Sequence, residues 1–277
     1  NPDSLGLKML GSKIAKLKRN KTEDNSKVLF SLNNVSTFNQ DPFSVNLKNT
    51  NFSLKTGQIL GIAGVAGNGQ NELMEIFLNE NNDNFKGDVI FKNQNINQLS
   101  TQDRKRLSIS YVTEQRLGHS AVPEMSLTEN VLLSMSHNKK FIKNDLINFK
   151  EIGNHTDKII KKFNVNAPSN LSKASQLSGG NLQKFIIGRE ILSNPELLIL
   201  SQPTWGIDAG SESFIRKTLI DLSLNGISII IISHDIDELL EICHDVCVLY
   251  EGRLSQKLNV EQIDTTQLGK YMGGLFD

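Results

Sequence analysis

The sequence predicts an α/β fold in which helices cover a parallel sheet, with an antiparallel β layer and an inserted helical subdomain. Two observations support this prediction. Short apolar runs typical of buried strands alternate with helical stretches, as in a parallel sheet covered on both faces. One run, "QILGIAG" from Gln58, ends in glycines and leads into a helix predicted from about Gly69 to Leu78, which is the context of a phosphate-binding loop.

The composition narrows the functional class only slightly. Hydrophobic residues make up 38% of the 277 residues, enough for a sizeable core. The formal net charge is zero, so bulk electrostatics favour neither nucleic acid nor an acidic membrane surface as a partner. The longest apolar run, "ISIIIIS" from Ile227, has the length of a buried strand. With two cysteines, Cys243 and Cys247, we expect a reducing compartment, the cytosol.

The N-terminal stretch, residues 1–26, is polar and basic. We interpret it as a solvated linker or frayed helix, with contact to a membrane surface as the alternative. Residues 27–277 then form the folded domain.

The elements of this domain follow from local patterns. "VLFSLNNV" and "TNFSL" predict antiparallel edge strands of a small β layer. Buried strands are predicted for the runs "QILGIAG", "SISYV", "ELLIL", "ISIIIIS" and "VCVLY". "SLTENVLLSM" and "EIGNHTDKIIKKFN" have helical periodicity and no strong strand between them, so a helical subdomain is predicted at about residues 113–192.

The stretch "GVAGNGQNE" has the shape of a phosphate-binding loop with altered chemistry. Its loop residues are Gly64, Val65, Ala66, Gly67, Asn68, Gly69, Gln70 and Asn71. The usual loop continues with Lys, which holds phosphates, and Ser or Thr, which binds Mg²⁺, where this chain has Gln70 and Asn71. Exchanging a charged hydrogen bond for a neutral one costs roughly 1 kcal/mol or more, about tenfold in affinity. The glycine backbone itself can still cradle phosphates.

Three further stretches carry polar residues at informative places. In "QLSGGNLQKFIIGREIL", Ser178 is a predicted N-cap, and Gly179 and Gly180 open a helix whose bare N–H groups attract phosphate. An ordinary capped helix is the alternative. In "LLILSQPTWGIDAGS", a buried strand ends in polar residues at a sheet edge, where ligands bind. In "IIISHDIDELLEICHDV", His234 follows a buried strand, and a structural histidine is the alternative to a catalytic one.

Taken together and in this order, the stretches resemble the ATP-binding domain of ABC transporters over about residues 27–277. This resemblance implies a P-loop (RecA-like) core, with ATP and Mg²⁺ as cofactors. It implies the following roles: residues 64–71 as the Walker A loop; Leu177, Ser178, Gly179, Gly180 and Asn181 as the signature; Ser201 and Gln202 as the Walker B positions; Asp208 as the D-loop; His234 as the H-loop; and Glu114 at the Q-loop position.

The Walker B positions depart from the family pattern. An Asp there would organise Mg²⁺ and a following Glu would polarise the attacking water, but this chain has Ser201 and Gln202. An amide cannot accept the proton of the water, and loss of a general base typically costs about 10²- to 10⁴-fold in rate. We therefore predict that this domain's own site hydrolyses ATP poorly or not at all, and we assign no metal ligand.

The intact signature suggests a role for a partner. Two ABC domains dimerise head to tail, so residues 177–181 would serve a partner's ATP, Asp208 would reach across the same interface, and Mg²⁺ is expected mainly at the partner site. "GNGQ", "LSGGNLQK" and "QPTWGIDAG" resemble the second half of the tandem ATPases of sugar and nucleoside importers. This resemblance implies that residues 1–26 are a linker or tail from a preceding half. "EQRLGHSAVPEMSLTENVLL" is most similar to the nucleoside-type branch, linked to basic membrane lipoproteins.

That resemblance implies several partners and a location. The partners are a first ABC half on the same chain or a dimer mate, permease transmembrane subunits, a solute-binding protein indirectly, and no nucleic acid. The location is peripheral, on the cytoplasmic face of the plasma membrane. Two rival interpretations are a soluble ABC ATPase that acts on ribosomes or nucleic acid, and a structural half that does not hydrolyse ATP.

Some single residues keep two interpretations. Glu114, Gln115 and Arg116 could transmit closure to a permease or form a solvated turn. Trp205 could stack on a base or pack at an interface. Phe43 stands at about the distance of the aromatic residue that stacks on adenine in ABC domains, with a core phenylalanine as the alternative. The segment Cys243–Cys247 resembles a metal cluster superficially, but core cysteines are the favoured interpretation.

Overall fold

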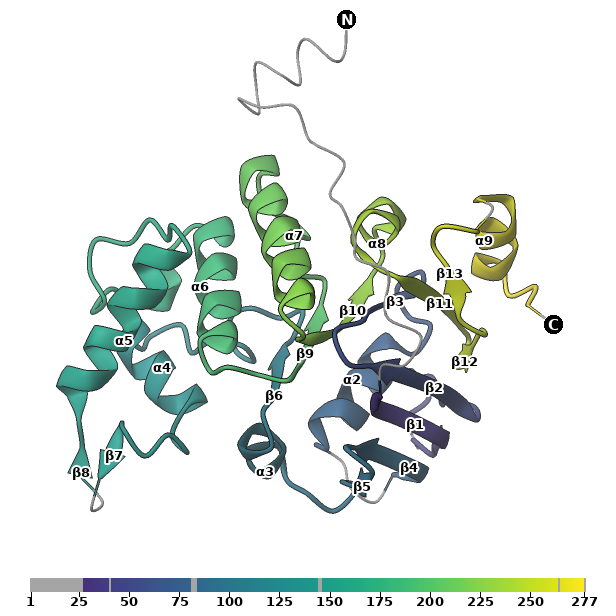
Figure 1. Ribbon diagram of the computed structural model, residues 1–277, viewed down its shortest axis with the longest axis horizontal. Helices are drawn as coiled ribbons and strands as arrows, with labels where there is room; N and C mark the ends of the chain where they lie inside the picture. Colours follow the sequence, from purple (N-terminus) through teal and green to yellow (C-terminus); the bar gives the residue numbers. More distant parts are fainter. Residues whose placement is uncertain (1–26, 40, 81–83, 144–145, 264, 277) are drawn as a thin grey trace, which may run out of the picture.

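Figure 1 shows the computed structural model of the chain, which describes residues 27–276 apart from residues 40, 81–83, 144–145 and 264. The predicted linker, residues 1–26, lies outside the described residues. The elements run in the order β1 (Val28–Thr37), β2 (Thr50–Lys55), β3 (Ile59–Ala63), α2 (Gln70–Leu78), β4 (Phe85–Phe91), β5 (Gln94–Asn95), α3 (Thr101–Arg106), β6 (Ile109–Val112), α4 (Leu127–Ser134), β7 (Ile142–Lys143), β8 (Leu146–Ile147), α5 (Phe149–Lys162), η1 (Ala174–Gln176), α6 (Gly179–Ile191), β9 (Leu197–Ser201), α7 (Ala209–Leu224), β10 (Ser228–Ser233), α8 (Ile236–Ile242), β11 (Asp245–Tyr250), β12 (Arg253–Leu254), β13 (Leu258–Asn259) and α9 (Thr265–Met272).

The main sheet has the strand order β12-β11-β3-β10-β9-β6, with β13 also paired to β11. The pairs from β11 through β3, β10 and β9 to β6 are parallel, whereas β12 and β13 lie antiparallel to β11. Every residue of β3, β6, β9 and β10 is buried. A strand that is covered on both faces needs apolar or hydrogen-bonded residues at each position, and these runs supply them. The predicted α/β fold is confirmed.

Alternate residues of the central strands enter two different cores. In β10, Ile229 and Ile231 pack with α6, α7 and α8, whereas Ile230 and Ile232 pack with α2 and the antiparallel strands. Successive side chains of a strand point to opposite faces, so one apolar run fills both cores. Figure 1 shows the corresponding layers, with α6, α7 and α8 above the main sheet and α2 below it.

The antiparallel sheet has the order β2-β1-β4-β5. The prediction that β1 is an edge strand is wrong, because β1 lies between β2 and β4. The sequence pattern did not reveal β4, whose segment "FKGDVIF" is interrupted by Gly87. Gly87 has a φ of 99°, and a Cβ there would lie 2.5 Å from the carbonyl oxygen of Asn34, so the irregular pairing of these strands requires glycine.

The segment predicted as a helical subdomain, about residues 113–192, contains α4, α5 and α6, and it also contains the short hairpin β7–β8, which was not predicted. Strands of two residues are too short to show a period of two in the sequence. Ser126 and Glu129 form a capping box at the start of α4, each side chain bonding to the backbone of the other residue. Among the described residues, no helix combines the length and apolar character needed to cross a membrane.

A close approach of α5 and α6 predicts the effect of one substitution. A Cβ at Gly188 of α6 would lie 2.6 Å from Cδ2 of Phe163 and 3.1 Å from Cγ2 of Ile159. We expect Gly188→Ala to lower the free energy of unfolding by about 1–3 kcal/mol, because the overpacking outweighs alanine's better helix propensity. Gly269→Ala in α9 is the control, since nothing lies within 4 Å of that Cβ position. Urea denaturation in which both variants gain stability would contradict this prediction.

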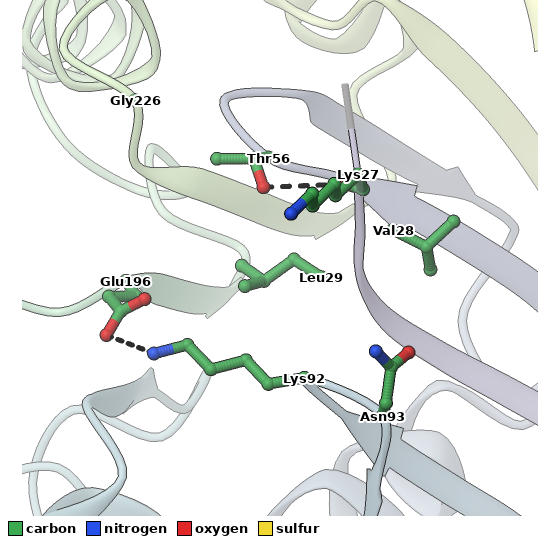
Figure 2. A pocket seen from close by; sticks show the side chains of 8 residues that line it. All are labelled: Lys27, Val28, Leu29, Thr56, Lys92, Asn93, Glu196 and Gly226. Atoms are coloured by element: carbon green, nitrogen blue, oxygen red, sulfur yellow. Dashed lines mark hydrogen bonds and ion pairs between the residues drawn. The ribbon is translucent and has the colours of Figure 1, made fainter. Parts of the chain in front are cut away.

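A cavity of about 510 Å³ lies at the amino ends of the main strands, on the opposite edge from the glycine loop. Figure 2 shows its lining, including Thr56 before β3, Glu196 before β9 and Gly226 before β10. Lys92 Nζ, from the turn after β4, lies 2.5 Å from Glu196 Oε1 and joins the two sheets across this hollow. We interpret it as a junction between the sheets rather than a ligand site.

Candidate nucleotide site

The carboxyl ends of the central strands bring the predicted site residues together. The glycine loop, residues 64–69, follows β3, and His234 follows β10. Ser201 ends β9, and Glu114 lies in the turn after β6. Because neighbouring parallel strands end at the same sheet edge, stretches far apart in the sequence meet there.

The glycine loop has the backbone of a phosphate-binding loop. Gly67 and Gly69 have φ values of 84° and 114°, which other residues adopt only with strain. Gly69 is the N-cap of α2, and no side chain bonds to the first amides of this helix from that position. The N-terminus of α2 therefore points into the concave side of the glycine loop, as in anion-binding loops.

The side chain of Gln70 fills this loop from within. Its Nε2 donates to the carbonyl oxygen of Val65 at 2.9 Å, and its Oε1 accepts from the backbone N–H of Asn68 at 3.0 Å. The residue is only 7% exposed, and Nε2 lies 2.6 Å from the place where a Cβ of Gly64 would be. An amide that the loop would offer to a phosphate is thus already paired within the loop.

Asn68 closes the loop further against the β11–β12 turn. Its Nδ2 donates to the carbonyl oxygen of Val65 at 2.8 Å, and its Oδ1 accepts from the backbone N–H of Glu251 at 2.8 Å. The N–H of Gly252 donates to the carbonyl oxygen of Asn68 at 2.9 Å. These bonds hold the loop in one conformation without any ligand.

The Walker B positions are buried and carry no carboxylate. Ser201 and Gln202 are 6% and 4% exposed, and Gln202 has a φ of 51°. The N–H of Gln202 donates to the carbonyl oxygen of Ile232 at 2.8 Å, whereas its buried Nε2 has no hydrogen-bond partner. Mg²⁺ prefers carboxylate and phosphate oxygens, which neither these residues nor Asn71 supply. The donor set does not fit magnesium, and no acidic, histidine or cysteine cluster in the described part of the chain could hold a metal.

His234 contacts the glycine loop directly. Its Nδ1 lies 2.7 Å from the carbonyl oxygen of Gly64, and its backbone N–H points to Oε1 of Gln202 at 3.4 Å. With a proton on Nδ1, the imidazole donates to that carbonyl and ties the end of β10 to the loop. This contact suits a structural histidine as well as the H-loop switch that the resemblance implies.

A cavity of about 530 Å³ borders the loop on the side of α2. Asn71, Ser201, Glu114 and Trp205 contribute to its lining, and Trp205 is 66% exposed. Three carboxylate residues line this cavity, Glu75, Glu80 and Glu114, and its lining contains no lysine or arginine. Since like charges repel at close range, this lining disfavours a polyphosphate. The structure therefore brings Glu114 and the Walker positions together around an acidic hollow.

The signature residues lie on the exposed N-terminus of α6. The prediction that Ser178 is the N-cap of α6 is confirmed by its backbone position, although its side chain makes no capping hydrogen bond. Its Oγ instead accepts from Nδ2 of Asn181 at 2.8 Å, because Asn181 stands at N3 and reaches back to the hydroxyl. Oδ1 of Asn181 accepts from the N–H of Asn166 at 2.8 Å. The amides of this first turn stay available to a ligand.

Asp208 packs against the signature and caps the next helix. It accepts from the N–H of Ser211 at 2.9 Å and from the hydroxyl of Ser211 at 2.8 Å. These hydrogen bonds hold the pKa of Asp208 below its ordinary value, so the carboxylate stays charged. A Cβ at Gly180 would lie 2.9 Å from Oδ2 of Asp208, so the close packing of the two segments requires glycine there.

Glu238 is a buried residue that the sequence analysis missed. It is 0% exposed and accepts from the hydroxyls of Thr204 at 2.7 Å and Ser233 at 2.8 Å. Burial raises its pKa. The carboxyl group thereby joins the segment after β9 to the residue before His234. Asp235 and Glu238 have the spacing of a helix start, which predicts a cap but not that the glutamate turns inward.

The remaining candidates lie at different depths. Cys243 and Cys247 are both buried and form no disulfide, which fits the core interpretation. Nδ1 of His244, between them, accepts from the backbone N–H of Ile59 at 3.0 Å. Phe43 is 95% exposed, so it is not a core residue, and its stacking on adenine stays a prediction.

A parallel sheet with a glycine loop after β3, a separate helical subdomain and a glycine-opened α6 defines the class of ATP-binding cassettes. The chain belongs to the ABC transporter family, whose family model matches residues 47–205.

The chain is also similar to curated import proteins. It is 32% identical over 228 residues to the guanosine import ATP-binding protein NupO of Bacillus subtilis, which covers 82% of this chain and 44% of NupO. It is 32% identical to the nucleoside import ATP-binding protein NupA of Lactococcus lactis, over 83% of this chain and 46% of NupA. It is 33% identical to the ribose import ATP-binding protein RbsA of Clostridium tetani, over 97% of this chain and 52% of RbsA. The chain thus spans about half the length of these relatives.

Solved structures support the fold alone. The dimeric bacterial ABC transporter cassette MJ0796 matches with a TM-score of 0.72 and 22% identity, covering 85% of this chain and 100% of the cassette. The ADP conformation of the cassette MJ1267 matches with a TM-score of 0.71 and 20% identity, over 90% of this chain and 100% of that cassette.

Proposed function

We propose that this chain is the ATP-binding half of an ABC importer ATPase that energises the uptake of nucleosides or simple sugars. It supplies the signature to a partner half, and its own site binds and hydrolyses ATP weakly or not at all. The similarity to import ATP-binding proteins for guanosine, nucleosides and ribose supports the importer class. Matches to about half of each relative are consistent with a second ABC half on the same or another chain.

The remaining parts of the proposal follow from this assignment. The chain acts with permease subunits, receives solute indirectly through a solute-binding protein, and lies peripherally on the cytoplasmic face of the membrane. ATP is its cofactor, and Mg²⁺ is expected mainly at the partner site. His234 acts as a tether of the glycine loop at the H-loop position.

One asymmetry supports the unequal roles of the two sites. The side chain of Gln70 occupies the glycine loop through bonds to Val65 and Asn68. The signature residue Ser178, in contrast, is exposed, and the first turn of α6 is open to a ligand. The backbone N–H of Asn68, which the loop would offer to a phosphate, is already paired with Gln70, and an acidic cavity lies beside it. The loop must break these hydrogen bonds before it can hold a triphosphate.

Nucleotide binding to this chain tests the proposal. We expect the wild-type chain to bind a fluorescent ATP analogue with a Kd weaker than about 1 mM. Gln70→Lys combined with Asn71→Thr should tighten binding at least about tenfold, because it removes the internal amide bonds and restores a charged donor. Gln262→Lys adds the same charge at an exposed position outside the loop and should change nothing. Wild-type ATP turnover within about tenfold of the complete ATPase would contradict the weak own site.

A co-purification experiment separates the importer from its rivals. We expect the chain, expressed with its native partners, to co-purify with permease subunits rather than with ribosomes. Recovery with ribosomes or nucleic acid would favour the soluble ATPase. If mutation of the signature left ATP hydrolysis by the complete ATPase unchanged, the result would favour the interpretation of this chain as a structural half.

A further inference from the structure

We propose that Arg116 is a positioning residue that joins three segments: its own turn (residues 113–121), the D-loop (residues 205–208) and the first turn of the signature helix (residues 178–181). The turn borders this chain's own site, whose glycine loop is filled by the side chain of Gln70 (the filled site). Through Arg116, this turn sets the position of the signature, which would contact the partner's ATP. The catalytic consequence rests on the proposed function, whereas the structural role of Arg116 does not.

The turn that carries Arg116 is closed by its own hydrogen bonds. The N–H of Ala121 donates to the carbonyl oxygen of Arg116 at 2.8 Å, and the N–H of Ser120 donates to that of Gln115 at 3.1 Å. Oγ of Ser120 accepts from the N–H of Thr113 at 3.1 Å, which closes the base of the turn. A turn tied at its tip and its base moves as one piece.

The guanidinium of Arg116 reaches both neighbouring segments. Its Nη2 donates to the carbonyl oxygen of Trp205, and its Nη1 lies 3.1 Å from the place where a Cβ of Gly179 would be. No carboxylate forms an ion pair with Arg116 within the described ranges. Burial lowers its pKa. A planar fork with several donors can span two segments in this way, whereas the single ammonium of a lysine cannot.

The first turn of α6 depends on such external contacts. It begins with Gly179 and Gly180, and the side chain of Ser178 makes no capping bond. Glycine carries the highest conformational freedom, so this turn is weakly ordered by its own residues. Asp208 packs against Gly180, and Nε2 of Gln183 donates to the carbonyl oxygen of Pro203 at 2.9 Å. These two contacts bind α6 to the segment after β9, and Arg116 adds a tie from the turn.

The same turn borders the acidic cavity. Glu114 and Gln115, directly before Arg116, line that cavity together with Asn71 and Ser201 of the filled site. Any displacement of the turn at the cavity therefore moves the guanidinium that contacts Trp205 and Gly179. This gives a continuous physical connection between the chain's own site and the surface that serves the partner.

Hydrogen exchange of this chain tests the structural role. We expect Arg116→Gln to speed the exchange of the first hydrogen-bonded amide of α6, that of Leu182, roughly tenfold, with the global unfolding midpoint unchanged. Arg116→Lys should give the same result, because it keeps the charge and loses the fork. Arg106→Gln, which breaks an exposed pair with Asp103, is the matched control and should not alter this exchange. Unchanged exchange in both Arg116 variants would overturn the proposal.

ATP hydrolysis by the complete ATPase tests the coupling. We expect Arg116→Gln to lower kcat roughly tenfold with little change in KM, because nucleotide still binds and the signature is misplaced. Faster exchange with an unchanged kcat, in an enzyme that Ser178→Glu inactivates, would overturn the coupling. Faster exchange in an enzyme that Ser178→Glu leaves active would support the role of Arg116 in ordering α6 and contradict the proposed function instead.

Discussion

Replacing Ser178 by glutamate should lower kcat/KM for ATP in the complete ATPase by at least about 100-fold, without loss of stability. Ser178 stands exposed at the N-terminus of α6, where it would meet the partner's ATP. A carboxylate there repels the phosphates and competes for the amides of the first turn, and removing a single preorganised donor already costs about 10²- to 10³-fold. An acidic residue at a helix N-terminus favours the helix, so folding is not compromised.

A matched variant shows whether the effect depends on the position of the added carboxylate or only on its charge. Ser175→Glu places the same side chain three residues earlier, at an exposed position in η1. We expect its steady-state kinetics and its melting temperature to match those of the parent. If Ser178→Glu retained the parent's activity, the signature of this chain would serve no nucleotide and the proposed function would fall.

Glu190→Gln should lower the free energy of unfolding by about 3–5 kcal/mol, the cost of breaking a buried ion pair. Glu190 is 2% exposed and lies near the end of α6, with its Oε1 2.9 Å from Nε of Arg189 and its Oε2 3.6 Å from Nζ of Lys105. The hydroxyl of Ser134 donates to it at 2.6 Å. This network joins α3, α4 and α6, so an amide leaves two cations at the junction without their counter-ion.

The pH dependence provides a second readout for the same variant. Burial raises the pKa of Glu190, but the charges of Lys105 and Arg189 and the hydrogen bonds from Ser134 and Arg189 together outweigh it, so the net shift is downward. Because its pKa is lowered in the folded state, the Glu190 carboxylate stabilises the fold above its ordinary pKa of 4.5. This stabilisation is lost as the pH falls below that value and the carboxylate becomes protonated. The gap in urea stability between parent and Glu190→Gln should therefore shrink in acid. Glu124→Gln, at an exposed pair with Lys173, should cost no more than about 1 kcal/mol, and an equal loss in both variants would contradict the prediction.

Local pattern was sufficient for much of the fold. The run "ISIIIIS" predicts a buried strand because a strand covered on both faces has no polar side, and β10 is buried throughout. The strand β4 escaped prediction because Gly87 interrupts its alternation, and the reason for that glycine is a close approach to Asn34, far away in the sequence. Register and neighbouring strands, which decide whether β1 is an edge, are properties of the sheet and not of the segment.

The candidate site was predictable in its residue types and not in its contacts. Gln70 and Asn71 stand where a lysine and a hydroxyl are expected, and this difference can be read from the sequence alone. That Gln70 bonds to Val65 and Asn68 inside the loop follows from the curvature of the folded backbone. Arg116 and Glu238 were missed as structural ties because their partners, Trp205 and Thr204, lie far away in the sequence, in the segment after β9.

The sequence by itself determined the class of this protein: an α/β cassette with an intact signature and a glycine loop without its charged residues. It did so because strand burial, helix starts and the donor set of a loop are local properties. The tertiary structure alone decided that the loop is occupied by its own glutamine and that the signature, D-loop and Arg116 turn lie against one another. Contacts between distant segments arise only when the parallel strands end at one edge and bring their loops together.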